Sequence, residues 1–96
     1  MDDHQRRVWA RLVEEVDAFN RGDLTVDRLN ANLNGLVGAA DIQDAALLTE
    51  YWDRRNDLFL DIAPEWFDSN SRVPGGEAQF RAWVAEVLAR PGDART

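Results

Sequence analysis

The sequence has no cysteine, no lysine and only one histidine in 96 residues. Without cysteine the chain can form neither a disulfide nor a thiolate zinc site, and it has no thiol nucleophile. Arginine supplies all 11 positive charges against 18 aspartate and glutamate residues, so the formal net charge is −7. Because nucleic-acid binding depends mainly on clustered lysine and arginine, this balance argues against a DNA or RNA partner.

Long apolar runs are missing as well. The longest ones, such as residues 36–40 and 45–48, are far shorter than the roughly 20 residues that cross a bilayer. The opening residues, Met-Asp-Asp-His-Gln-Arg-Arg, lack the basic-then-apolar order of a signal peptide. We therefore expect a cytoplasmic protein that has no membrane partner and is either a monomer or a homodimer.

Residues that perform chemistry are scarce, which argues against an enzyme. His4 is the single imidazole, so a Ser-His-Asp arrangement has no other base available. The Glu-x-x-His pairs that hold di-metal sites in helical bundles are absent, and Asp53, Asn56 and Asp57 do not match the spacing of a calcium loop. We expect no catalytic residue, no cofactor and no metal, and a small enzyme or metal carrier is the least favoured interpretation.

Four segments show the spacing of apolar side chains that predicts amphipathic helices, and no segment alternates as a strand does. The expected helices cover residues 3–21, 26–37, 42–63 and 77–90. Gly22 is placed to end the first helix, and Thr25 is placed to cap the start of the second. Asp41 is expected to cap the third helix, which Pro64 ends.

Two segments interrupt or follow these helices. Residues 64–76 are rich in turn-forming residues and are predicted to be a loop, with one short turn around Glu65-Trp66-Phe67. Residues 91–96 are predicted to be a disordered tail. Four helices with short connections favour an all-α fold, an antiparallel four-helix bundle in which residues 1–96 form a single domain.

The third expected helix carries an apolar face and an acidic face on roughly opposite sides. The apolar face comprises Leu47, Leu48, Tyr51, Trp52, Leu58, Phe59 and Ile62. Arg55 falls within that arc, so we expect its guanidinium to extend to solvent or to pair. Four carboxylates follow one another on the other side and are expected to face solvent; this acidic ridge comprises Glu50, Asp53, Asp57 and Asp61.

The acidic ridge accounts for much of the charge imbalance, because residues 41–68 hold eight acids and two bases. Glu65 and Asp68 extend the ridge beside Trp66 and Phe67. The ridge is either a solvated face that keeps the protein soluble or a surface for a basic partner. Trp66 and Phe67 either anchor that partner or cover the end of the core.

Three segments together resemble the colicin D immunity-like class of small bacterial immunity proteins. They are Val16–Val26 at the end of the first helix, Leu47–Asp53 in the third, and Gly76–Leu88 after the polar loop. Proteins of this class are four-helix bundles that block a nuclease toxin by presenting acidic side chains to its basic cleft. The resemblance implies an antitoxin-like immunity protein that neutralises a basic toxin domain.

The corresponding partner-binding residues would be Glu50, Asp53, Asp57, Asp61, Glu65, Trp66, Phe67 and Asp68. An alternative interpretation remains open on the same residues. The corner around Trp66 and Phe67 would then make the chain a helical adaptor or oligomerisation domain with no toxin partner. A salt-insensitive interaction that depends on the aromatic residues would favour this alternative.

Overall fold

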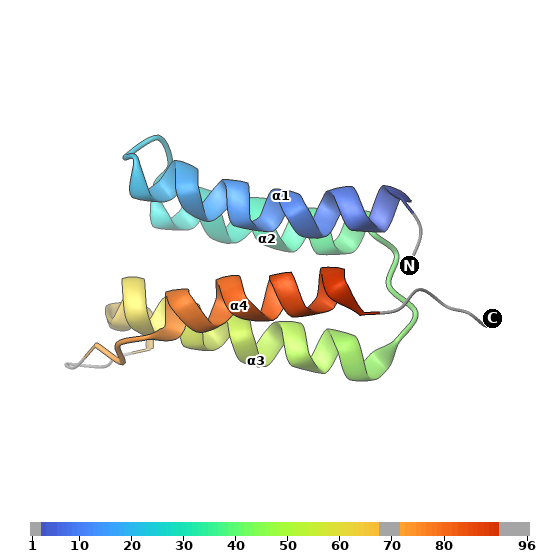
Figure 1. The fold of residues 1–96 in the computed structure, drawn as a ribbon. Helices are drawn as coiled ribbons and strands as arrows, with labels where there is room; N and C mark the ends of the chain where they lie inside the picture. The colour runs from blue at the N-terminus through green and yellow to red at the C-terminus, as the bar shows by residue number, and fades with distance from the viewer. Residues whose placement is uncertain (1–2, 68–71, 91–96) are drawn as a thin grey trace. The chain divides into compact units, whose positions relative to one another are not determined.

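Four α-helices and one 3₁₀ turn make up the part of the chain that the computed structural model describes, residues 3–67 and 72–90. In chain order they are α1 (Asp3–Asn20), α2 (Val26–Ala39), α3 (Ala45–Ile62), η1 (Pro64–Phe67) and α4 (Gly76–Ala89) (Figure 1). None of the described residues forms a strand, so the predicted all-α fold is confirmed. Within the same ranges no helix is long and apolar enough to span a membrane. The predicted tail, residues 91–96, lies outside the described residues.

The start of α3 differs from the prediction. Asp44, and not Asp41, is the N-cap: its carboxylate accepts hydrogen bonds from the backbone N–H groups of Ala46 at 2.9 Å and Leu47 at 3.2 Å. Asp41 has a φ of +50° and lies in the turn that follows α2. The prediction was wrong because both aspartates precede the same apolar pattern, and only the one whose carboxylate reaches the unpaired amides of the first turn can cap the helix.

The other predicted helix ends are confirmed to within two residues. Gly22 has a φ of +85° and follows α1, where the backbone N–H of Asp23 donates to the Ala18 carbonyl at 2.9 Å. This is the hydrogen bond of a Schellman ending, which glycine adopts at little cost. Thr25 caps α2 by accepting a hydrogen bond from the Arg28 backbone N–H at 3.2 Å. The short turn predicted in the loop after Pro64 is η1.

The helices belong to two compact units. In the first, α1 and α2 lie side by side and run in opposite directions, because the start of α1 contacts the end of α2: Gln5 donates to the Ala40 carbonyl at 3.1 Å. Further along, Asn32 donates to the Glu15 carboxylate at 2.6 Å. Both apolar stripes are buried: Val8, Trp9, Leu12 and Val16 of α1, and Leu29, Leu33 and Val37 of α2.

The second unit, residues 42–85, contains α3, η1 and most of α4. Here too the helices are antiparallel: Glu50, near the start of α3, bonds to Trp83 in α4, and Asp61, near the end of α3, bonds to the first turn of α4. Its buried apolar residues are Tyr51, Leu58, Phe59, Ala63, Phe80, Trp83 and Val84. Each unit thus contains an antiparallel helix pair, while the four-helix bundle and the single domain stay predictions.

Gly76 sets how closely α4 approaches α3. A Cβ atom placed on Gly76 would overlap the backbone carbonyl oxygen of Asp57 and would lie 3.1 Å from the Cβ of Asp61. Only a residue without a side chain lets the two helices meet at this distance. The first turn of α4 therefore lies directly on the part of α3 that carries the last two residues of the acidic ridge.

Candidate protein-interaction surface

The acidic ridge does not face solvent along its whole length. Asp61 is buried, with 6% of its surface exposed, and Glu50 is half-buried. The prediction of a solvent-facing ridge is therefore wrong for Asp61 and only partly right for Glu50. It assumed that α3 buries one apolar arc, whereas α4 also covers the flank of α3 beyond that arc. Gly76 makes this possible because it brings α4 against the acidic side.

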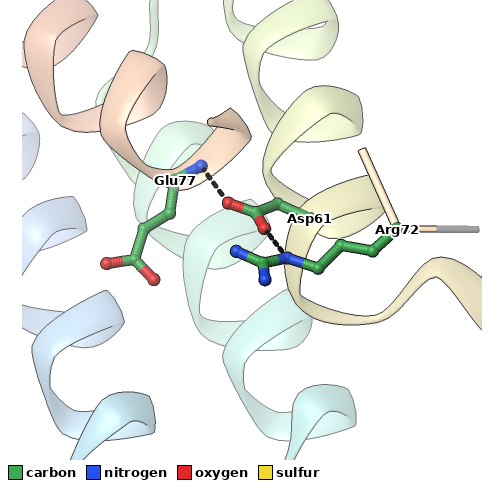
Figure 2. A network of polar contacts seen from close by, with 3 residues as sticks. All are labelled: Asp61, Arg72 and Glu77. Atoms are coloured by element: carbon green, nitrogen blue, oxygen red, sulfur yellow. Dashed lines mark hydrogen bonds and ion pairs between the residues drawn. The ribbon is translucent and has the colours of Figure 1, made fainter. Parts of the chain in front are cut away.

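Asp61 holds the start of α4 in place (Figure 2). Its Oδ2 atom accepts a hydrogen bond from the backbone N–H of Glu77 at 3.0 Å, and its Oδ1 atom forms an ion pair with Arg72. The Glu77 N–H lies in the first turn of α4, where amides have no partner within the helix. Asp61 thus acts as an N-cap supplied by a neighbouring helix.

The charge of Asp61 is stabilised by these contacts. Burial alone would raise the pKa of Asp61, but the hydrogen bonds from Glu77 and Arg72 and the positive charge of Arg72 outweigh it and lower the pKa. The carboxylate is therefore ionised at neutral pH and is engaged by the protein's own residues. Its observed contacts are structural.

Glu50 has a similar role at the other end of the ridge. Trp83 is 3% exposed, and its indole Nε1–H donates to the Glu50 carboxylate at 2.9 Å. A buried indole N–H needs such an acceptor, because leaving a buried donor unsatisfied costs about 1–3 kcal/mol. Glu50 thus supplies a polar contact between α3 and α4.

Replacing Glu50 with alanine is expected to lower the free energy of unfolding by about 1–2 kcal/mol, since the buried Trp83 N–H loses this acceptor. The matched variant Glu50→Gln keeps an acceptor oxygen and should change the free energy by about 0.5 kcal/mol or less. Urea unfolding followed by circular dichroism compares the two variants. Equal stability of both would show that the hydrogen bond contributes nothing.

Three acids of the predicted site remain accessible. Asp53 and Glu65 are exposed and Asp57 is half-exposed. No hydrogen bond or ion pair joins these three carboxylates to another residue in the described ranges 3–67 and 72–90. They are the carboxylates of the predicted site that a partner could reach without displacing an internal contact. Asp68 lies outside the described residues.

Aromatic rings and one arginine form a column along α3 and η1. Trp52, Arg55 and Phe59 are spaced three and four residues apart on α3, and Trp66 continues the series from η1. The Arg55 guanidinium carbon lies 5.3 Å from the centre of the Trp52 ring and 5.1 Å from that of Phe59. The Phe59 and Trp66 rings are stacked, with centroids 5.1 Å apart and planes 1° apart. We call these four residues the aromatic column.

The two ends of the aromatic column reach solvent. Trp52 is 46% exposed and Trp66 is 40% exposed, whereas Phe59 between them is fully buried. Trp52 belongs to the predicted apolar face of α3 but is exposed, whereas its neighbour Tyr51 on the same face is buried. Burial raises the pKa of the Tyr51 hydroxyl, against the opposing effect of the nearby Arg55 charge. Of the two expected outcomes for Arg55, the structure shows pairing. Its guanidinium lies over the rings of Trp52 and Phe59 and donates a hydrogen bond to the Asn56 side-chain oxygen at 3.0 Å.

Trp66 covers part of the core and is also partly exposed, while its role as an anchor for a partner stays a prediction. One face of its ring covers Phe59 and so the edge of the core, while two-fifths of its surface stays exposed. Phe67 is exposed to the same extent. Sequence reasoning did not foresee the contact between Trp52 and Arg55, although their three-residue spacing on a helix is a signal for a cation–π contact.

Large apolar residues are unevenly exposed. In residues 3–67 and 72–90, the exposed ones are Trp52, Trp66, Phe67 and Val73, and all of them belong to the second unit. Tryptophan and arginine are the residue types that contribute most to binding energy at protein interfaces. The second unit therefore carries both exposed aromatic rings and accessible carboxylates, which are residue types found at protein-binding surfaces.

The described residues do not form a metal-binding site of the usual kind. Among the residues whose placement is described, no group of three or more histidine, aspartate or glutamate side chains is close enough to hold an ion. What the second unit offers instead is apolar ring surface and negative charge, which suit a protein partner. Comparison of the chain with protein-family models, with curated proteins and with solved structures finds no match in any of the three.

Proposed function

We propose that this chain is an antitoxin-like immunity protein, which binds a toxin domain with a basic surface and neutralises it. The observation that carries the proposal is the joint presence, on α3 and η1, of exposed aromatic rings and accessible carboxylates. The rings supply apolar contact area, and the carboxylates of Asp53, Asp57 and Glu65 supply charge complementarity to a basic partner.

A nuclease is the toxin class that this surface fits best. A nuclease must attract a polyanion, so its active-site cleft is basic, and carboxylates can occupy the positions that phosphates take in the substrate. Binding of that kind blocks the toxin without any chemistry from the inhibitor. An inhibitor that acts in this way needs a rigid acidic surface with apolar anchor residues.

The test co-expresses the chain in bacteria with the toxin domain encoded by the adjacent gene and measures growth. We expect the chain to restore growth, and we expect the double variant Asp53→Arg with Glu65→Arg to lose that protection. Reversing the two exposed charges should slow association with a basic surface by about 10- to 1000-fold at low salt.

The matched control reverses two exposed acids of the first unit, Glu14→Arg with Asp23→Arg. It makes the same change in net charge and should leave protection intact. Asp61 and Glu50 are left unchanged, because we expect their replacement to weaken the contacts between α3 and α4. Protection that survives the Asp53 and Glu65 reversals at equal protein levels would contradict the acidic mechanism, and the absence of any protection would contradict the proposal.

A second candidate function is a helical adaptor that assembles with itself or another protein. The observation in its favour is the exposure of Trp66 and Phe67, 40% each, next to each other in η1. It predicts an oligomer that light scattering detects and that dissociates when both residues become alanine. If the protein were a monomer at all concentrations, assembly with itself would be contradicted.

A further inference from the structure

We propose that the exposed face of Trp66 binds an arginine side chain of the partner, with Glu65 as the counter-charge for its guanidinium. This inference rests on the proposed function and deepens it, because it states which chemical group of the partner is recognised and where. The basic partner would insert one arginine at the η1 end of the aromatic column.

The first support is the order of groups within the column. The Arg55 guanidinium lies between the rings of Trp52 and Phe59, and the Trp66 ring stacks on Phe59. The guanidinium carbon and the ring centres of neighbouring groups are 5.1–5.3 Å apart. Phe59 stacks on one face of Trp66, and 40% of the Trp66 surface is exposed, so we place the incoming guanidinium on the face away from Phe59. Trp has the aromatic face that binds cations best, and planar guanidinium groups stack on such faces.

The second support is charge. Glu65 directly precedes Trp66, is exposed, and has no hydrogen bond or ion pair with any residue in the described ranges. An exposed ring alone would accept any apolar group, whereas a ring beside a carboxylate favours a cation. A second copy of this chain is disfavoured as the occupant, since each copy carries a net charge of −7 and eight of its acids lie in residues 41–68.

The third support is rigidity. Trp66 is held flat against Phe59, and Phe59 is completely buried, so the ring is already in position before a partner arrives. Binding to a fixed ring loses little side-chain entropy. Arg55 shows that the same column holds a guanidinium over its rings within the free protein.

The test titrates the 96-residue chain with an arginine homopeptide and follows the indole N–H signals by nuclear magnetic resonance. We expect the Trp66 signal to shift, and the buried Trp9 and Trp83 signals to stay in place. Trp66→Leu should weaken binding about 2- to 30-fold, the range of a cation–π contact. Trp66→Phe keeps a ring and should retain more affinity than Trp66→Leu.

The counter-charge is tested separately. Glu65→Gln should weaken binding of the arginine peptide and reduce its salt dependence, while the control Glu14→Gln, an exposed acid on α1, should do neither. A lysine homopeptide of equal length should bind more weakly than the arginine peptide, since an ammonium group cannot stack flat on the ring.

Several results would overturn the inference: no shift of the Trp66 signal, an equal response to a glutamate homopeptide, or a shift that depends on protein concentration alone and so reports self-association. The two proposals fail differently. If Trp66→Leu still protects cells from the toxin as well as the unchanged protein does, the arginine site is wrong and the immunity function stands. If the peptide binds at Trp66 but no toxin is neutralised, the site stands and the immunity function is wrong.

Discussion

Replacing Asp61 with alanine is expected to lower the free energy of unfolding by about 2–3 kcal/mol, because α4 loses its cap and Arg72 its counter-charge. For a chain of this size that loss corresponds to a fall in Tm of roughly 10 °C or more. Most of the effect should come from the buried hydrogen bond to Glu77. The ion pair contributes less, since the Arg72 side chain is 64% exposed and an exposed charge is well solvated without a partner.

Two variants separate these contributions. Arg72→Gln removes the ion pair and keeps the cap, and should lower the free energy of unfolding by about 1 kcal/mol or less. Asp53→Ala removes an exposed acid from the same helix and should change it by about 0.5 kcal/mol or less. Urea unfolding at neutral pH ranks the three variants. If Asp61→Ala and Asp53→Ala were equally stable, Asp61 would not be the cap of α4.

The same residue predicts a pH dependence with a definite sign. The pKa of Asp61 is lower in the folded protein than in the unfolded chain, where an aspartate has a pKa of about 3.9. Its stabilising contribution is therefore complete above the unfolded pKa and is lost as the pH falls through the folded pKa. We expect the stability gap between the unchanged protein and Asp61→Asn to be widest at neutral pH and to shrink below about pH 4. A gap that stays constant with pH would contradict the assignment.

Gly76→Ala is the second large effect, with an expected loss of about 3 kcal/mol. The added methyl group would overlap the Asp57 carbonyl oxygen, which is part of the α3 backbone and cannot rotate away as a side chain can. The start of α4 must then move outwards, and the hydrogen bond from Glu77 to Asp61 lengthens with it. Unfolding by urea or heat measures the loss.

Gly35→Ala is the matched control for that substitution. Gly35 is likewise a helical residue, in the interior of α2, but a Cβ placed there meets no atom within 4 Å. Alanine should therefore stabilise α2 by about 0.5–1 kcal/mol through its higher helix propensity. The same chemical change is thus expected to have opposite signs at the two positions. If both substitutions stabilised the protein, the close approach of α4 to Asp57 would be wrong.

The two large effects should also be coupled. Asp61 and Gly76 both support the contact between α3 and the start of α4. Each single substitution is expected to break the hydrogen bond from Glu77 to Asp61, and that bond can be lost only once. The double variant Asp61→Ala with Gly76→Ala is expected to lose less than the sum of the single losses.

Local rules explain how much of the fold was predictable. Apolar spacing identified all four helices, because a periodicity near 3.6 residues is a property of each segment alone. Thr25 and Gly22 marked helix ends correctly, since their roles depend on their own backbone and on residues three or four positions away. The same rules could not locate the start of α3, because Asp41 and Asp44 satisfy them equally. Only the folded structure shows that the Asp44 carboxylate reaches the unpaired backbone amides of the first turn.

The candidate site was predictable in composition and not in arrangement. The excess of acids in residues 41–68 and the aromatic pair Trp66 and Phe67 are visible in the sequence. Angular position on one helix, however, cannot show where a second helix packs. The sequence therefore could not assign Asp61 to the inside, nor join Trp52 and Arg55 to Trp66 in one column.

The sequence by itself determined that this protein is helical and acidic and that it has no cysteine and a single histidine, because these properties follow from composition and local spacing. Tertiary structure alone decided which acids are accessible and which aromatic rings are exposed. The physical reason is the close contact at Gly76, which places α4 over one flank of α3, buries Asp61 and leaves Asp53 and Glu65 exposed. Packing between segments distant in sequence thus divides an apparent four-residue ridge into two carboxylates with structural contacts, Glu50 and Asp61, and two accessible ones, Asp53 and Asp57.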